Sequence, residues 1–281
     1  MRLWRLAIGQ VGIDVHCDVP DCIPILAAML RLYVERGDGE PRLVFRIDRD
    51  GDGMILSING NELWHGFDAA ETTAGFEVYF YLHTLDALQP ACLSLHAATV
   101  GVGQHAVCLA GISGAGKSSL CTAALLDGAV YLSDEFSLLD RRGYIAPFPR
   151  PLQWGKQRHP AFTHAAMQAA GFAKFRFYFN DYRGKRLGTM LWFPPHTGGP
   201  SLPLTAVVLP TYRPDAGNTP VPLRRSQALI EIAAHMHQRL EPAQLIRELN
   251  RRMPPDTRFL SLPFSDARQA WQAVKSELLS G

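Results

Sequence analysis

A glycine-rich loop between an apolar run and a helical pattern is the stretch of this sequence best suited to chemistry. Residues 111–118 read Gly-Ile-Ser-Gly-Ala-Gly-Lys-Ser and fit the pattern G-x-x-x-x-G-K-[ST]. In such a loop, backbone N–H groups crowd round phosphate oxygens, the lysine meets the β/γ-phosphates and the serine hydroxyl reaches Mg²⁺. A glycine turn that matches by chance is the alternative. The flanking patterns favour a nucleotide-binding loop, made of Gly111, Ser113, Gly114, Ala115, Gly116, Lys117, Ser118 and Ser119.

Two adjacent carboxylates, Asp134 and Glu135, come soon after this loop. We expect a short strand over 129–132 that stops just before them. A right-handed β-loop-α-β connection makes that strand parallel to the phosphate-loop strand, either next to it or one strand away, so its carboxyl end faces the same phosphates. One acid could hold Mg²⁺ and the other could accept a proton from a hydroxyl nucleophile. The alternative is a solvated turn.

A histidine precedes the loop on a strand expected over 93–100. Residues 101–104 read Gly-Val-Gly-Gln and predict a hairpin turn. If Val100 pairs with His105 across that four-residue turn, His96 lies opposite Leu109, close to the mouth of the phosphate loop. Its imidazole could take part in the chemistry, or it could be a hydrogen-bonded residue that supports the loop.

Basic residues further along are candidates for binding an acceptor. A proline-rich segment, 147–151, contains Arg150 and is followed by Lys156, so an extended loop that presents two cations is one interpretation and a surface connector is the other. Residues 174–186 mix basic and aromatic side chains. We expect a strand with a solvated face there. A binding site for an acidic substrate is the second interpretation, and a nucleic-acid groove is the third.

The elements that must position these residues divide the chain at about residue 90. Residues 1–90 predict a small α+β domain, and residues 91–281 predict an α/β domain around the phosphate loop. Within the first part, Asp48, Asp50, Asp52 and Gly53 match the beginning of a calcium-binding loop. Asn59 stands where that loop needs a bidentate glutamate, so we expect a tight hairpin turn instead.

Composition sets the wider limits. The chain has 281 residues, of which 47% are hydrophobic and 19% charged, with a formal net charge of +2. That charge is too small to argue for nucleic acid or an anionic membrane as a partner. The five cysteines are odd in number, and two of them, Cys108 and Cys121, flank the phosphate loop inside apolar runs, which favours buried thiols in a reducing cytoplasm over a disulfide framework. We see no export signal or membrane span, and we expect a cytoplasmic protein.

Taken together, several segments resemble the HPr kinase/phosphorylase superfamily, and more narrowly its HPr-kinase-related branch, which includes kinases of peptide-tailoring systems such as lasso peptide clusters. The likeness covers roughly residues 90–215. It is carried by Leu-His-Ala-Ala at 95–98, the phosphate loop, Leu-Ser-Asp-Glu at 132–135, the segment 147–151 with Lys156, and residues 206–214.

The resemblance implies a phosphoenolpyruvate-carboxykinase-like nucleotide fold and transfer of phosphate to a serine hydroxyl, with the donor left open among ATP, GTP and pyrophosphate. It implies a reaction-centre role for His96, and roles in binding phosphate and Mg²⁺ for Lys117 and Ser118. Asp134 and Glu135 match the family's Asp-Asp pair, with a glutamate in the second place, so which of them is the base stays open. The sequence also lacks the Glu-Ile-Arg-Gly segment associated with phosphorolysis, and its first 90 residues differ from the usual N-terminal domain.

We therefore expect a Mg²⁺- and ATP-dependent kinase of a hydroxyl on a peptide or small acceptor, with catalytic residues His96, Lys117, Asp134 and Glu135. Ser118 and Asp134 would bind the metal, and Arg150 and Lys156 the acceptor. The alternatives are an ATP-binding recruitment module that transfers no phosphate, and a bifunctional HPr kinase/phosphorylase. Neither nucleic acid nor a membrane is expected as a partner, and self-association into a homo-oligomer is left open.

Overall fold

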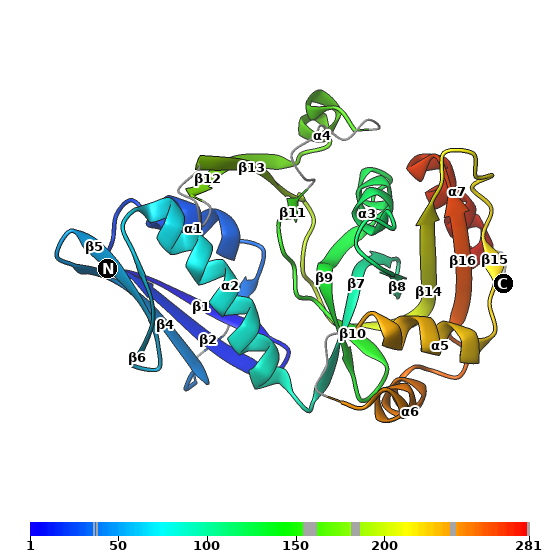
Figure 1. Ribbon diagram of the computed structural model, residues 1–281, viewed down its shortest axis with the longest axis horizontal. Helices are drawn as coiled ribbons and strands as arrows, with labels where there is room; N and C mark the ends of the chain where they lie inside the picture. The colour runs from blue at the N-terminus through cyan, green and yellow to red at the C-terminus, as the bar shows by residue number, and fades with distance from the viewer. Residues whose placement is uncertain (36, 38, 154–161, 181–185, 237–239, 280–281) are drawn as a thin grey trace. The chain divides into compact units, whose positions relative to one another are not determined.

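The structure is a computed structural model that describes residues 1–35, 37, 39–153, 162–180, 186–236 and 240–279 (Figure 1). The fold is of the α/β class, as the sequence predicts, and its two larger sheets are mixed. The chain forms two compact units. The N-terminal unit is 1–90 with 153–157 and 173–193, and the C-terminal unit is 91–152 with 158–172 and 194–281. Residues 173–193 thus belong to the N-terminal unit, whereas the sequence suggested a single division at about residue 90.

The N-terminal unit is built on a six-stranded sheet in the order β3-β1-β2-β4-β5-β6. Helix α2 crosses one face of this sheet (Figure 1). Its Asp68 N-cap accepts a hydrogen bond from the Glu71 N–H, and the Glu71 carboxylate accepts one from the Phe67 N–H, which satisfies two orphan donors. The elements are β1 (Arg2–Ile8), β2 (Val11–Cys17), α1 (Ile23–Leu30), β3 (Val34–Glu35), β4 (Leu43–Asp50), β5 (Gly53–Ile58), β6 (Asn61–Gly66), α2 (Ala69–Leu88), β12 (Ala173–Asn180) and β13 (Arg186–Phe193).

The calcium-like motif and the basic, aromatic stretch both lie in this unit. Asp50 pairs with Gly53 at the end of β4 and β5, so the calcium-like motif is a two-residue hairpin turn, as predicted. Residues 173–180 of the basic, aromatic stretch form β12, which pairs antiparallel with β13, so the predicted strand is confirmed for these residues, whereas Arg183 and Lys185 lie outside the described part of the chain.

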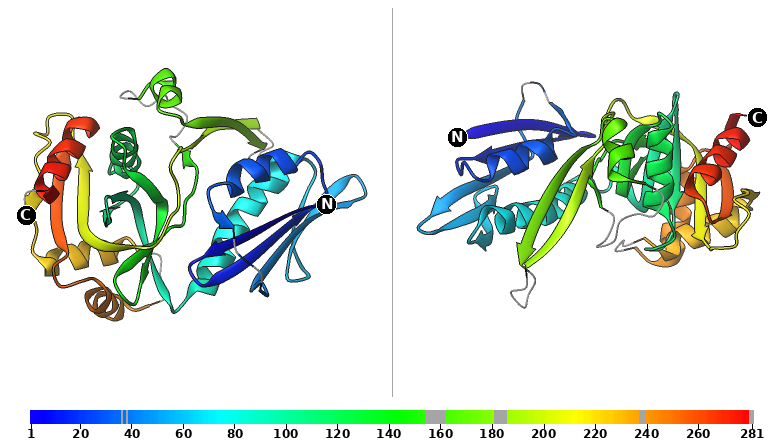
Figure 2. Two further views of the ribbon diagram at one scale, coloured as in Figure 1. Left: turned by 180° about the vertical axis from the view of Figure 1, so that it is seen from behind. Right: turned by 90° about the horizontal axis from the view of Figure 1, so that it is seen from above.

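The C-terminal unit is built on a seven-stranded mixed sheet in the order β10-β9-β7-β8-β14-β16-β15. Figure 2 shows its strands and helices from behind and from above. Its elements are β7 (Cys92–Val102), β8 (His105–Ala110), α3 (Lys117–Leu126), β9 (Val130–Asp140), β10 (Tyr144–Ala146), α4 (His164–Ala169), β14 (Leu202–Tyr212), β15 (Val221–Pro222), α5 (Arg225–Ala234), α6 (Pro242–Arg252), β16 (Arg258–Phe264) and α7 (Ala267–Leu279). The short strand β11 (Leu152–Gln153) lies where the chain passes from this unit to the other.

Successive side chains on each strand point to opposite faces of the sheet, so the core of this unit has two parts, one on each face. Leu95, Cys108 and Val207 belong to one apolar cluster together with Leu229 of α5 and Leu249 of α6. Neighbouring residues on the same strands point the other way, toward α3, which contacts β7, β8, β9 and α7. The face under α3 is therefore the one that meets the phosphate loop.

All five cysteines are buried thiols, as expected from the sequence. None of the helices in the described part of the chain has the length and apolar character needed to span a bilayer.

Candidate phosphate-binding site

The glycine-rich loop joins the end of β8 to the start of α3. Gly111, Gly114 and Gly116 have φ values of 153°, 83° and 99°, a region that L side chains rarely adopt. Gly116 is the N-cap of α3 and offers no side chain to accept a bond from the first turn. The amides of that turn, with the positive end of the helix dipole, can therefore meet an anion. The sequence prediction of strand, loop and helix is confirmed.

Gly116 is also required by packing. A Cβ atom at this position would lie 2.3 Å from Cζ of Phe264, a fully buried ring at the end of β16. The loop is further anchored by the Tyr212 N–H, which donates to the Ala115 carbonyl at 3.2 Å. Phe264 and Tyr212 thus shape the loop from strands far along the chain, and the loop motif carries no signal for them.

Lys117 begins α3 and turns back into the loop. Its Nζ donates to the carbonyl oxygens of Gly111 at 2.7 Å and Ile112 at 3.0 Å, and the side chain is buried. Burial lowers the pKa of this ammonium, and the nearby carboxylates of Glu135 and Asp134 oppose that effect. The loop therefore already holds a buried cation where phosphate oxygens would lie.

The acid pair lies in the middle of a strand, not at its end. The sequence predicted that the strand after α3 would stop before Asp134, but β9 continues to Asp140 because it pairs with β7 along almost its whole length. Both β8 and β9 run antiparallel to β7, so β9 is parallel to β8 and one strand away, one of the two arrangements expected.

Asp134 faces the start of α3. Its Oδ1 accepts a hydrogen bond from the Ser118 Oγ at 3.1 Å, and the carboxyl is buried. Burial raises the pKa of Asp134 to about 6, helped by the negative charge of Glu135 and opposed by Ser118, Lys117 and Arg150. Ser118 and Asp134, predicted as the metal-binding pair, are thus in direct contact.

His96 lies nearer the loop than the sequence predicted. The turn between β7 and β8 holds two residues rather than four, because Val102 pairs with His105. The ladder therefore places Ala98, not His96, opposite Leu109, and it ends where Ala97 pairs with Ala110. His96 is the next residue outward, level with the beginning of the glycine loop.

Glu135 reaches His96 through an unusual backbone conformation. Its partner in β7 is Ala97, which belongs to the cluster under α5 and α6, so a regular strand would direct Glu135 into that core. Instead Glu135 has a φ of 111°, its side chain is 39% exposed, and its Oε1 lies 3.5 Å from His96 Nδ1. A left-handed non-glycine residue costs about 1–3 kcal/mol and is concentrated at functional sites.

The two basic residues predicted to bind an acceptor have different outcomes. Arg150 is half-buried, and its positive charge lowers the pKa of Asp134, so it belongs to the electrostatic environment of the acids. The Tyr131 hydroxyl donates to the Arg150 carbonyl and fixes the backbone there. Lys156 lies outside the described residues.

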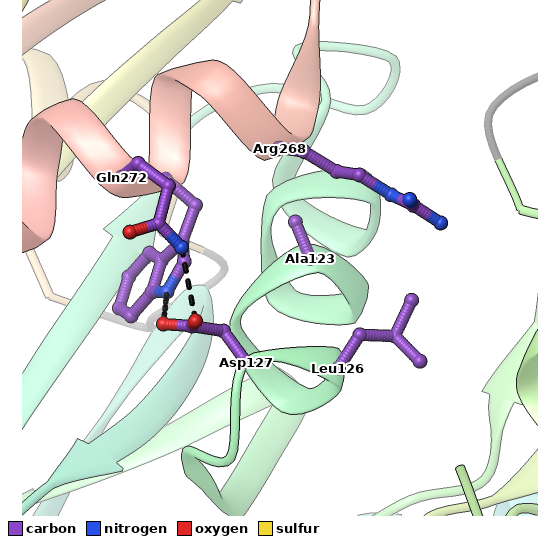
Figure 3. Close-up of a pocket in the computed structure, with 6 residues that line it drawn as sticks. Ala123, Leu126, Asp127, Arg268 and Gln272 are labelled. Carbon is purple, nitrogen blue, oxygen red and sulfur yellow. Dashed lines mark hydrogen bonds between the residues drawn. The ribbon is translucent and has the colours of Figure 1, made fainter.

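A separate cavity lies between α3 and α7 (Figure 3). Its volume is about 290 Å³, and it is at the C-terminal end of α3, whereas the phosphate loop is at the N-terminal end. There Asp127 accepts hydrogen bonds from Trp271 at 3.1 Å, Gln272 at 2.9 Å and Lys275 at 2.7 Å. Burial would raise the pKa of Asp127, but these three donors lower it, and their contacts join α3 to α7.

The site therefore brings together five of the predicted residues: the loop-held cation of Lys117, the buried Ser118–Asp134 pair, and Glu135 beside His96. Comparisons of the sequence with models of protein families and with curated proteins found no match.

Proposed function

We propose that this protein is a kinase that transfers the γ-phosphate of ATP to a hydroxyl group of a peptide or small acceptor. The observation that carries the proposal is the His96–Glu135 pair, with 3.5 Å between Nδ1 and Oε1, placed beside a phosphate loop by a strained residue. Binding of a nucleotide alone needs the loop and a cation. It has no use for an exposed carboxylate held next to an imidazole.

Asp134 and Glu135 have different roles in the proposed reaction. Asp134 is buried against Ser118, so this pair is suited to hold Mg²⁺, whereas Glu135 is accessible and is suited to accept the hydroxyl proton. The described residues contain no cluster of three metal-binding side chains. That fits Mg²⁺ bound through one or two protein oxygens and the phosphates, where it would neutralise charge on the β- and γ-oxygens.

In the reaction, the acceptor oxygen forms a bond to the γ-phosphorus while the bond from that phosphorus to the β–γ bridging oxygen breaks, and ADP leaves. The hydroxyl proton passes to Glu135, which His96 orients. The loop amides and Lys117 stabilise the charge on the transferring group. A phosphoenolpyruvate-carboxykinase-like fold and kinship with the HPr-kinase-related branch form part of this proposal, supported by the loop, the histidine and the acid pair in the mixed sheet.

The test is transfer of labelled phosphate. The protein is incubated with γ-labelled ATP, Mg²⁺ and a library of serine-containing peptides, and products that gain one phosphate are identified by mass spectrometry. Replacement Lys117→Met should lower transfer by about three orders of magnitude and leave the unfolding midpoint nearly unchanged, because the two carbonyls that lose their donor belong to the half-buried Gly111 and the exposed Ile112, where water can replace it. Nucleotide binding without any phosphorylated product would instead support a recruitment module.

A further inference from the structure

The N-terminal unit leaves one edge of its sheet open beside an apolar helix face. Strand β6 is last in the sheet order, and no strand of the described chain pairs with its outer edge. An unpaired edge offers alternate N–H and C=O groups to an extended segment. Natural proteins often block such edges with lysine or proline, and β6, which reads Asn-Glu-Leu-Trp-His-Gly, has neither.

Exposed apolar side chains lie next to this edge. Val78 and Leu82 of α2 are 55% and 54% exposed and occupy one helix face, since they are four residues apart. Gly75 lies on the same face, and a Cβ there would be 3.0 Å from Trp64 of β6, so the indole of Trp64 borders this face. Trp64, Val78 and Leu82 are named here the apolar strip.

The two elements that form the strip, β6 and α2, carry charge of one sign, and the cations nearby come from other elements: Arg42 donates to the Ala87 carbonyl of α2, and β12, which contains the exposed Lys174, contacts α2. From residue 50 to residue 116 the sequence contains no lysine or arginine. The residues of β6 and α2 and the turn between them carry five acids: Glu62, Asp68, Glu71, Glu77 and Asp86. Glu62 and Asp86 are exposed, and Asp86 follows Leu82 by four residues on the same helix face. A positively charged partner is therefore favoured, and nucleic acid is not.

We infer that the β6 edge and the apolar strip bind an extended, basic peptide segment with apolar residues, which adds a strand to the sheet. A second copy of this chain is a poor occupant, because two β6 edges would bring the same acids together and like charges across a strand pair are destabilising. If the proposed function holds, this peptide is the phosphate acceptor or is covalently continuous with it.

The test uses a defined probe, the fluorescein-labelled peptide Lys-Val-Lys-Val-Ser-Val-Lys-Val-Lys, with the full chain and no nucleotide. Fluorescence anisotropy should show binding that weakens as salt is raised. The double replacement Val78→Lys and Leu82→Lys should weaken binding by about tenfold or more. The control Ile230→Lys, at a residue of α5 in the other unit that is 58% exposed, should leave binding unchanged.

Two further probes test the strand geometry and the charge. Peptides N-methylated on odd or on even residues should differ, because only one set of N–H groups faces the β6 edge. The inference is overturned if the original probe does not bind, or if a peptide with glutamate in place of every lysine binds equally well. It is also overturned if the double variant binds the original probe as tightly as the unmodified protein does, or if both methylated peptides bind the unmodified protein as tightly as the original probe does.

The same experiment separates this inference from the proposed kinase. The Lys117→Met protein should bind the probe like the unmodified protein, since the strip and the loop are in different units. Peptide binding without phosphate transfer to any peptide would contradict the proposed kinase activity and support the peptide-binding surface. Phosphate transfer to basic peptides at a rate that the Val78 and Leu82 replacements do not change would support the kinase activity and contradict the peptide-binding surface.

Discussion

In the C-terminal unit, Lys117 and Asp134 bury opposite charges close together and a glutamate is held in a left-handed conformation within a strand. Among the described residues of the N-terminal unit, the non-glycine residue with a left-handed backbone is Asn59, which lies in an Asn-Gly hairpin turn where asparagine tolerates this conformation. Of the four buried charged side chains in the described chain, Lys117 and Asp134 lie with the strained Glu135 where phosphates would bind, whereas Asp14 and Arg252 lie elsewhere. The acids around β6 and α2 are instead open to solvent or nearly so.

The largest effect on stability is expected from Gly116→Ala. The new methyl group would overlap the Phe264 ring, and alanine is strained at a φ of 99°. We expect a loss of about 3–5 kcal/mol in the free energy of unfolding, measured by urea denaturation, and loss of nucleotide binding. Gly114→Ala is the matched control: its φ is 83° but its Cβ would meet no atom within 4 Å, so it should cost only about 1 kcal/mol. Equal losses would contradict the packing argument.

A smaller effect concerns the pH dependence that Asp134 gives to the nucleotide-free protein. Because its folded pKa is raised to about 6 from 3.8, the native state keeps a proton that the unfolded chain has released between those values. Raising the pH from about 3 to beyond 7 should therefore lower the free energy of unfolding, by about 3 kcal/mol. Asp134→Asn should remove this part of the profile. A profile that is the same in both proteins would show that Asp134 is not desolvated.

The smallest effect concerns the strain at Glu135. Glycine at this position should be more stable than alanine by about 1 kcal/mol, because only glycine adopts a φ of 111° without cost. At Ser261, an ordinary position in β16, the order should be reversed, since glycine weakens a strand. The same order at both positions would mean that Glu135 is unstrained.

Much of the fold could be predicted from the sequence where local pattern decides it. The helix over Ala69–Leu88 has an Asp cap and a proline soon after its end, and the glycine loop is specified by residue type. The sequence does not indicate strands β1 and β2. The apolar pattern over residues 23–35 favours one helix, but α1 ends at Leu30, and Val34 and Glu35 form β3. The secondary structure of these segments depends on which strands they pair with in the sheet, and a single sequence does not show those partners.

The site was predicted in its residues but not in its geometry. The position of His96 depends on whether the turn after β7 has two residues or four, and a shift of two residues moves it from beside Leu109 to the loop itself. The exposure of Glu135 depends on a backbone angle that its residue type disfavours. The partner of Gly116, Phe264, lies 148 residues away, beyond any local signal. The position of His96, the exposure of Glu135 and the packing partner of Gly116 all depend on contacts between segments far apart in the sequence.

The most direct test of the account is phosphate transfer by Glu135→Gln compared with its nucleotide affinity. Glutamine keeps the size of the side chain but cannot accept the proton, and it lies outside the loop and the Ser118–Asp134 pair. We predict that binding of ATP and Mg²⁺ changes by less than about threefold while transfer to the acceptor falls by about a hundredfold or more, the usual range for a general base. Transfer at the unmodified rate would contradict the proposed catalytic role of the His96–Glu135 pair.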